Sequence, residues 1–198
     1  MSEEVRTSES HAIYADFVPV EELGTPGRLG MTLAPGKKAD SIFGFRWERD
    51  LETDLRVLKE AELAADVLVS LMEEHEYHEF EIPDLFIRDD IGGVEILRFA
   101  IVDGRAPLEE QAQEFEVLIR HIVSRLEGNS NVVAHCRGGL GRTGTVAACV
   151  LVAMGRHSAD MAMKVVRKAR RGAIEPGEQE EYVRKFEQRV LTQTSEAR

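Results

Sequence analysis

The segment from residue 131 to residue 154 constrains the fold of this chain more than any other. It opens with the short apolar run Asn131–His135, passes through the glycine-rich stretch Cys136–Arg142 and ends in the apolar stretch Thr143–Met154. A short apolar run is typical of a buried strand, and the longer apolar stretch is typical of a buried helix. A loop between such a strand and helix lies at the helix N-terminus, where unpaired N–H groups favour an anion. The segment therefore predicts an α/β fold with a phosphate site.

Apolar patterns elsewhere predict the other elements of this fold. Strands are expected at residues 65–71 and 94–101, with one or two shorter strands between residues 11 and 38. Helices are expected from residue 50 onward and over residues 107–126, 158–171 and 176–191, and Pro83 is expected to open a short helix. In the second of these helices one apolar stripe is expected to face the core: Leu108, Ala112, Phe115, Ile119, Ile122 and Leu126.

We expect one α/β domain over residues 11–192, in which helices flank a central, mostly parallel mixed sheet. Residues 1–10 are expected to form a flexible N-terminus, and residues 193–198 a C-terminal tail. The chain carries 36 acidic and 25 basic side chains, a formal net charge of −11. Nucleic acids and anionic membranes require a basic face, so this balance excludes both as the main partner.

Two further absences narrow the class of protein. No apolar run approaches the roughly 20 residues of a membrane-spanning helix, and the first residues lack the features of a signal peptide, so we expect a cytoplasmic protein. The two cysteines, Cys136 and Cys149, are too few for a disulfide framework or a cysteine zinc site. We expect a monomer.

The glycine-rich loop has the residue types that bind a phosphate. Several N–H groups can converge on one anion only if the loop adopts unusual backbone angles, which its glycines allow. The expected phosphate-binding loop comprises Arg137, Gly138, Gly139, Leu140, Gly141 and Arg142. Cys136 lies at its entrance, where the helix N-terminus favours a thiolate, and the planar guanidinium of Arg142 matches two phosphate oxygens. Thr143 is expected to donate its hydroxyl to that thiolate.

The pattern His135-Cys136-x5-Arg142-Thr143-Gly144 resembles the signature loop of the cysteine-dependent protein tyrosine and dual-specificity phosphatases. It is not a Walker loop, because no Gly-Lys-Ser/Thr sequence ends it. Other segments are similar, in the same order, to the kinase-associated phosphatases within that superfamily: Leu33–Lys38, Arg49–Leu55, Ala100–Pro107, Gly138–Arg142 and Val146–Cys149. The resemblance covers about residues 30–190 and implies the dual-specificity and tyrosine phosphatase fold.

The resemblance also implies a mechanism that needs no metal and no cofactor. Cys136 attacks phosphorus to form a phosphocysteine, Asp103 protonates the leaving oxygen, and Arg142 with the loop N–H groups stabilises the transition state. Asp103 follows an expected strand in a segment similar to the general-acid loop of the kinase-associated phosphatases, with Asp89 and Asp90 as alternatives. The implied substrate is a phosphorylated protein, and pocket depth decides whether phosphoserine and phosphothreonine react as well as phosphotyrosine.

The chain departs from the family at the residue that orients the hydrolytic water. The family has Gly-x-Ile-Gln where this chain has Gly172-Ala173-Ile174-Glu175, so Glu175 itself or Gln179 would take that role. Two alternatives therefore stay open: a phospho-dependent binding module with slow turnover, and a phosphatase of an inositol phosphate, a lipid or an RNA 5′ end. Arg137 adds a positive charge that suits such acidic substrates, although a solvated arginine is the simpler interpretation.

Other reactive side chains have simpler explanations. Cys149 lies in an apolar helix and is expected to be an inert core residue. His75 and His78 lie among four glutamates, and we expect a solvated acidic loop there and no metal site: Glu73, Glu74, Glu76 and Glu79. The basic run Arg167–Arg171 ends a predicted helix, where cations are favourable, and docking of an acidic substrate segment is the alternative.

Overall fold

Five short strands form the main sheet in the order β2-β3-β8-β6-β7. The computed structural model describes residues 4–41, 44–60, 62–88 and 92–196. The strands are β2 (Asp16–Phe17), β3 (Leu29–Thr32), β6 (Val67–Ser70), β7 (Glu95–Arg98) and β8 (Val132–His135). Strand β2 is antiparallel to β3, and every other pairing is parallel, so the sheet is mixed and mostly parallel, as the sequence predicts.

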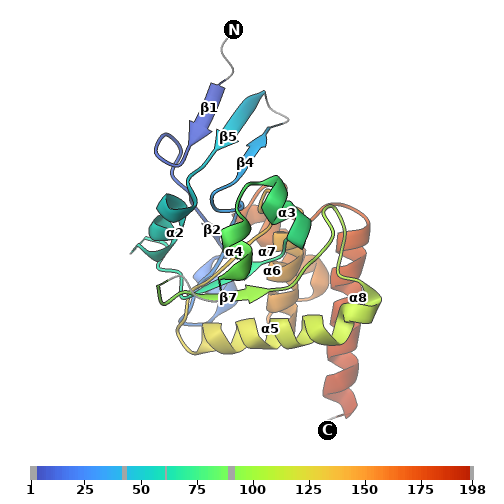
Figure 1. Cartoon of the computed structure of the whole chain (residues 1–198). Helices are drawn as coiled ribbons and strands as arrows, with labels where there is room; N and C mark the ends of the chain where they lie inside the picture. The colour runs from blue at the N-terminus through green and yellow to red at the C-terminus, as the bar shows by residue number, and fades with distance from the viewer. Residues whose placement is uncertain (1–3, 42–43, 61, 89–91, 197–198) are drawn as a thin grey trace.

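Helices cover both faces of this sheet (Figure 1). One face carries α5 (Ala112–Glu127), α6 (Gly141–Ala153), α7 (Ala159–Ala169) and α8 (Glu178–Glu196). The other carries α2 (Leu51–Lys59), α3 (Glu74–Glu79) and α4 (Pro83–Ile87). Successive side chains of β8 point to opposite faces of the sheet and so contribute to the core on both sides. Val132 and Ala134 pack under α6, and Val133 packs on the opposite face.

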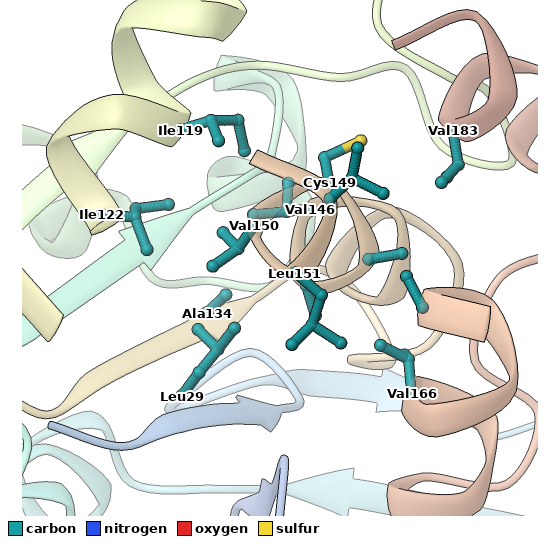
Figure 2. Close-up of a cluster of buried hydrophobic side chains, with 14 of the residues drawn as sticks. Leu29, Ile119, Ile122, Ala134, Val146, Cys149, Val150, Leu151, Val166 and Val183 are labelled. Carbon is teal, nitrogen blue, oxygen red and sulfur yellow. The ribbon is translucent and has the colours of Figure 1, made fainter. Parts of the chain in front are cut away.

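Helix α6 lies at the centre of the larger core. Every residue from Gly141 to Val152 is buried, and α5, α7 and α8 surround the helix. Figure 2 shows Ile119 of α5, Val166 of α7 and Val183 of α8 pointing toward its apolar side chains. A helix buried all round is held in place by every neighbour. The fold therefore fixes the position of the α6 N-terminus.

A second, three-stranded sheet lies at the N-terminal end of the molecule, above the main sheet in Figure 1. It consists of β1 (Glu4–Thr7), β5 (Phe45–Glu48) and β4 (Lys38–Asp40), in the order β1-β5-β4. The flexible N-terminus expected over residues 1–10 is therefore replaced at residues 4–7 by a strand parallel to β5. The guanidinium of Arg6 also lies over the Phe45 ring, 3.7 Å from its centroid.

Most predicted elements are confirmed, and several boundaries differ. The helix expected from residue 107 begins at Ala112 after a 3-10 turn, η1 (Glu109–Gln111), which leaves Leu108 of the expected stripe 46% exposed. Helix α8 runs to Glu196, beyond the expected domain end at residue 192. The expected acidic loop contains α3. A further short helix, α1 (Val20–Leu23), precedes β3. None of the described helices combines the length and the apolar character that crossing a membrane requires.

Candidate active site

The carboxyl ends of the parallel strands meet at one edge of the sheet. Cys136 directly follows the central strand β8, and Asp103 follows β7, so the topology brings them to the same edge. A cleft of about 710 Å³ opens there, and its lining includes Cys136, Asp103, Arg142 and Glu175. In parallel sheets, ligands bind at this edge.

The loop after β8 has a conformation that requires glycine at one position. Gly139 has a φ of +69°, and a Cβ atom there would lie 2.1 Å from the carbonyl oxygen of Thr32 on β3. Two consecutive loop carbonyls face basic side chains, since Arg137 O accepts from Lys37 Nζ at 3.3 Å and Gly138 O accepts from Arg170 Nη2 at 3.1 Å. The N–H group that follows each carbonyl points the opposite way across a planar trans peptide. Those N–H groups are thereby left available to an anion.

Arg142 is held rigidly in the interior. Its side chain is 1% exposed, and its two terminal nitrogens bind both carboxylate oxygens of Glu76 at 2.6 and 2.8 Å. Nη1 also donates to the carbonyl oxygen of Ile101 at 2.9 Å. Burial lowers the pKa of Arg142, but the hydrogen bonds to Glu76 and the negative charges of Cys136, Glu76 and Asp103 together outweigh burial and raise that pKa. Arg142 Nε is buried without a partner among the described residues, which leaves one donor free for a ligand.

Glu76 is a site residue that the sequence did not identify. The acidic stretch was expected to be solvated, yet Glu76 is 1% exposed and belongs to α3. Burial raises its pKa, but the hydrogen bonds from Arg142 and from the N–H of Glu73 outweigh this and lower the pKa below its usual value. The sequence feature that could have indicated a helix here is the capping box of Glu73 and Glu76, which lies shortly after strand β6.

Asp103 lies beside Arg142. Its Oδ1 accepts a hydrogen bond from Arg142 Nη2 at 2.8 Å, and its side chain is 53% exposed toward the cleft. The chain reverses direction immediately after Asp103, in a turn in which Gly104 has a φ of +72°. The alternatives Asp89 and Asp90 lie outside the described residues.

Glu175 and Gln179 have different surroundings. Glu175 lines the cleft, and a Cβ atom on Gly141 would lie 2.7 Å from its Oε1. Gln179 is 1% exposed; its Nε2 donates to the carbonyl oxygen of Arg105 at 3.0 Å and its Oε1 accepts from the N–H of Glu175 at 2.8 Å. Both polar atoms of the Gln179 amide are therefore used inside the protein, whereas the carboxylate of Glu175 adjoins the cleft.

The expected hydrogen bond from Thr143 to Cys136 is not made in the structure. Thr143 is fully buried, and its hydroxyl has no partner among the described residues. Helix α6 begins at Gly141, two residues before the predicted start, and this places Thr143 inside its buried first turn. Cys136 and Cys149 are both free thiols, and complete burial raises the pKa of Cys149, which agrees with an inert core residue.

Basic side chains line one side of the cleft. Arg137 is paired with Glu79 at 2.8 Å and lies over the Phe80 ring, so it is not simply solvated. Lys37 is half-buried; burial and the positive charge of Arg137 lower its pKa to about 8, against the opposing effects of Cys136, Asp103 and Glu79. No functional role for Lys37 was predicted from the sequence.

Two other residues line the cleft at the catalytic loop, one beside the loop and one within it. Arg170, which the sequence placed in a run at a helix end, is 6% exposed and binds Asp16 at 2.6 Å besides the loop carbonyl. Leu140, at the tip of the loop, is 38% exposed. Within the described residues, no group of three or more His, Cys, Asp or Glu side chains is arranged to hold a metal ion.

Comparisons with known proteins agree with this geometry. Residues 45–156 match the family model described as "Polymorphic toxin system, DSP-PTPase phosphatase". Cyclin-dependent kinase inhibitor 3 of Rattus norvegicus is 26% identical over 98% of this chain and 87% of its own length, and that of Sus scrofa is 27% identical over the same shares.

Solved structures share the fold. The crystal structure of kinase associated phosphatase with its catalytic cysteine replaced by serine has a TM-score of 0.78 at 22% identity, over 90% of this chain and 96% of that one. The active form of Tk-PTP has a TM-score of 0.62 at 28% identity, over 88% of this chain and 97% of that one. The chain therefore belongs to the DSP-PTPase family, near the kinase-associated phosphatases, and is a protein tyrosine and dual-specificity phosphatase.

Proposed function

We propose that this chain hydrolyses phosphate monoesters on proteins through a phosphocysteine on Cys136. The observation that carries the proposal is the meeting of three groups in one cleft: the thiol of Cys136, the guanidinium of Arg142 and the carboxyl of Asp103. In the first step the Cys136 thiolate attacks phosphorus, the bond from phosphorus to the leaving oxygen breaks, and Asp103 transfers a proton to that oxygen. The products are a phosphocysteine and a free hydroxyl group.

Arg142 holds the phosphoryl group in both steps. Glu76 and the carbonyl oxygen of Ile101 occupy Nη1, and Nη2 binds Glu76 and Asp103. The donors for two equatorial oxygens are therefore Nε and the N–H of Nη2 that binds Asp103 before the substrate arrives. The N–H groups of Gly138 and Gly139 point away from Lys37 and Arg170 and complete the cradle. Donors fixed before the reaction stabilise the developing charge without reorganisation.

Water regenerates the enzyme in the second step. The water oxygen attacks phosphorus, the sulfur–phosphorus bond breaks to restore the thiolate, and Asp103 accepts the proton. We assign the positioning of this water to Glu175, because its carboxylate lines the cleft, whereas the Gln179 amide, although it also lies near Gly141, is bound to the backbone of Arg105 and Glu175. No step requires a metal ion.

The substrate class follows from the family. The relatives are named for the inhibition of a cyclin-dependent kinase and for association with a kinase, and we extend to this chain a phosphorylated protein as substrate. Phosphotyrosine is the expected target, together with phosphoserine and phosphothreonine if their shorter side chains reach Cys136.

The test is hydrolysis of para-nitrophenyl phosphate by the wild type and by Cys136→Ser, in excess EDTA, with and without vanadate. We expect turnover that survives EDTA, falls with vanadate and disappears in the serine variant. A Cys149→Ser variant is the matched control and should retain activity, because Cys149 is buried away from the cleft. Activity that persists in Cys136→Ser would refute the mechanism, and a stoichiometric burst without turnover would indicate a binding module.

A further inference from the structure

The loop that carries Asp103 is anchored at its two ends. Ile101 and Ala106 are buried, whereas residues 102–105 between them are exposed. On the side of the catalytic loop, Arg142 donates to the carbonyl oxygen of Ile101 and pairs with Asp103. The opposite side of this general-acid loop faces the N-terminus of α8. The loop thus lies between the phosphate cradle and a helix that takes no part in the chemistry.

Two consecutive side chains of α8 bind this general-acid loop. Glu178 accepts the N–H of Ala106 at 3.1 Å through Oε1 and pairs with Arg105 Nη1 at 2.9 Å through Oε2. Gln179 donates to the carbonyl oxygen of Arg105 at 3.0 Å. The ion pair and hydrogen bond to the loop lower the pKa of Glu178 below its usual value, so its carboxylate is charged at neutral pH. The two residues after Asp103–Gly104 are therefore both held by α8.

The contacts from α8 become more important when a phosphate binds. Arg142 Nη2 pairs with Asp103 in the structure, and the same nitrogen is a donor for the phosphoryl group in the proposed function. A phosphate that takes this donor weakens the bond that Arg142 makes to Asp103, whereas the contacts of Glu178 and Gln179 lie outside the cleft and persist. An exposed loop without such contacts would sample many conformations, most of them with Asp103 away from the leaving oxygen.

We propose that Glu178 and Gln179 are positioning residues for Asp103, which hold the general-acid loop over the cleft while the leaving group departs. This inference rests on the proposed role of Asp103 as general acid. It assigns Gln179 to the loop, not to the hydrolytic water. It also predicts a signature that a purely structural role would lack, because loss of the general acid matters most for substrates whose leaving group needs a proton.

The experiment compares kcat/KM on phenyl phosphate, which has a poor leaving group, with kcat/KM on para-nitrophenyl phosphate, which has a good one. This ratio reports the steps up to departure of the leaving group and leaves out the hydrolysis of phosphocysteine, which is common to both substrates. Glu178→Ala is the test variant, and its side chain is 48% exposed, so the core is left intact. Glu181→Ala on the same helix removes the same charge from an exposed glutamate paired with Lys185 and is the matched control. Gln179→Met is a second test variant of similar volume, checked for folding by its thermal midpoint. Asp103→Asn provides the reference signature.

We expect Glu178→Ala to lower kcat/KM on phenyl phosphate by about tenfold and on para-nitrophenyl phosphate by less than about twofold, with Glu181→Ala unchanged on both. Added to Asp103→Asn, the Glu178→Ala change should have no further effect, because both act through one group. Equal losses on the two substrates, or independent effects in the double variant, would overturn the proposal. If Asp103→Asn itself shows no dependence on the leaving group, the general-acid assignment fails and this inference fails with it.

Discussion

Glu76 and Arg142 show how a single contact organises the catalytic residues. Both side chains are 1% exposed, and the carboxylate binds the guanidinium through two hydrogen bonds across 66 positions of sequence. A buried ion pair contributes little net stability, but the loss of one partner leaves an uncompensated charge. The pair therefore acts mainly by fixing the direction in which Arg142 presents its remaining donors.

Glu76→Gln should destabilise the protein and weaken its affinity for phosphate analogues. The amide keeps the shape of the side chain but removes the negative charge, and the buried Arg142 is left without its main counter-charge. We expect a loss of about 3 kcal/mol in the free energy of unfolding, measured in urea, and a higher inhibition constant for vanadate. Glu74→Gln, an exposed residue of the same helix, is the control. Similar unfolding curves for the two variants would contradict this assignment.

Lys37 should make phosphate affinity dependent on pH in the neutral to basic range. With a pKa lowered to about 8, its side chain is a cation below that pH and becomes neutral above it. We expect inorganic phosphate to inhibit less strongly as pH rises through about 8, and Lys37→Met to bind phosphate more weakly than the wild type at neutral pH with a flatter profile. Lys38→Met, which removes a lysine paired with exposed Glu81, should keep the wild-type profile. An unchanged profile in Lys37→Met would refute the role.

At the scale of elements, the predictable parts are those whose sequence pattern is local. Strand β8 and helix α6 follow from one apolar run and one apolar stretch, and the Asp50 cap begins α2 where a helix is predicted from residue 50 onward. The sheet of β1, β5 and β4 was missed because its strands contain no apolar run and β1 pairs with β5, which is remote in sequence. The contact of Glu76 was missed for the same reason, since an acidic neighbourhood gives no sign of a remote arginine.

Asp54 of α2 forms a buried ion pair and also binds the loop that carries Lys37. Asp54 binds Arg49 through two hydrogen bonds of 2.7 Å and accepts the N–H of Gly36 at 2.8 Å, with both charged side chains almost fully buried. Asp54→Asn should lower the free energy of unfolding by about 3–5 kcal/mol, because Arg49 loses its counter-charge. Glu52→Gln on the exposed side of the same helix should cost little. Urea unfolding of both variants measures the difference, and equal midpoints would contradict the prediction.

At the scale of the whole molecule, net charge and site charge have opposite signs. The chain carries a net charge of −11, yet the cleft that would receive a phosphate is lined by Lys37, Arg137, Arg142 and Arg170. The net charge therefore excludes nucleic acids and anionic membranes as main partners, but it does not report the local charge of the cleft. The phosphate site was predicted from the glycine-rich loop motif alone. Tertiary structure brings these cations together from the β3–β4 connection, the catalytic loop, helix α6 and the end of α7.

The central position of His135 predicts how the whole fold responds to acid. His135 is fully buried, and burial lowers its pKa to about 4, from an ordinary value near 6.5. Between these values the unfolded chain binds a proton that the folded chain does not, so stability falls as pH decreases from about 6.5 to about 4, by up to about 3 kcal/mol. Glu76 affects stability at lower pH than His135 does. Its pKa is lowered below 4.5, so its contribution to stability disappears only when the pH is low enough to protonate that carboxylate.

Urea unfolding at several pH values should give a shallower acid dependence for His135→Asn than for the wild type. His121→Asn, which replaces an exposed histidine, should match the wild type; a wild-type slope in His135→Asn would show that other groups cause the acid sensitivity.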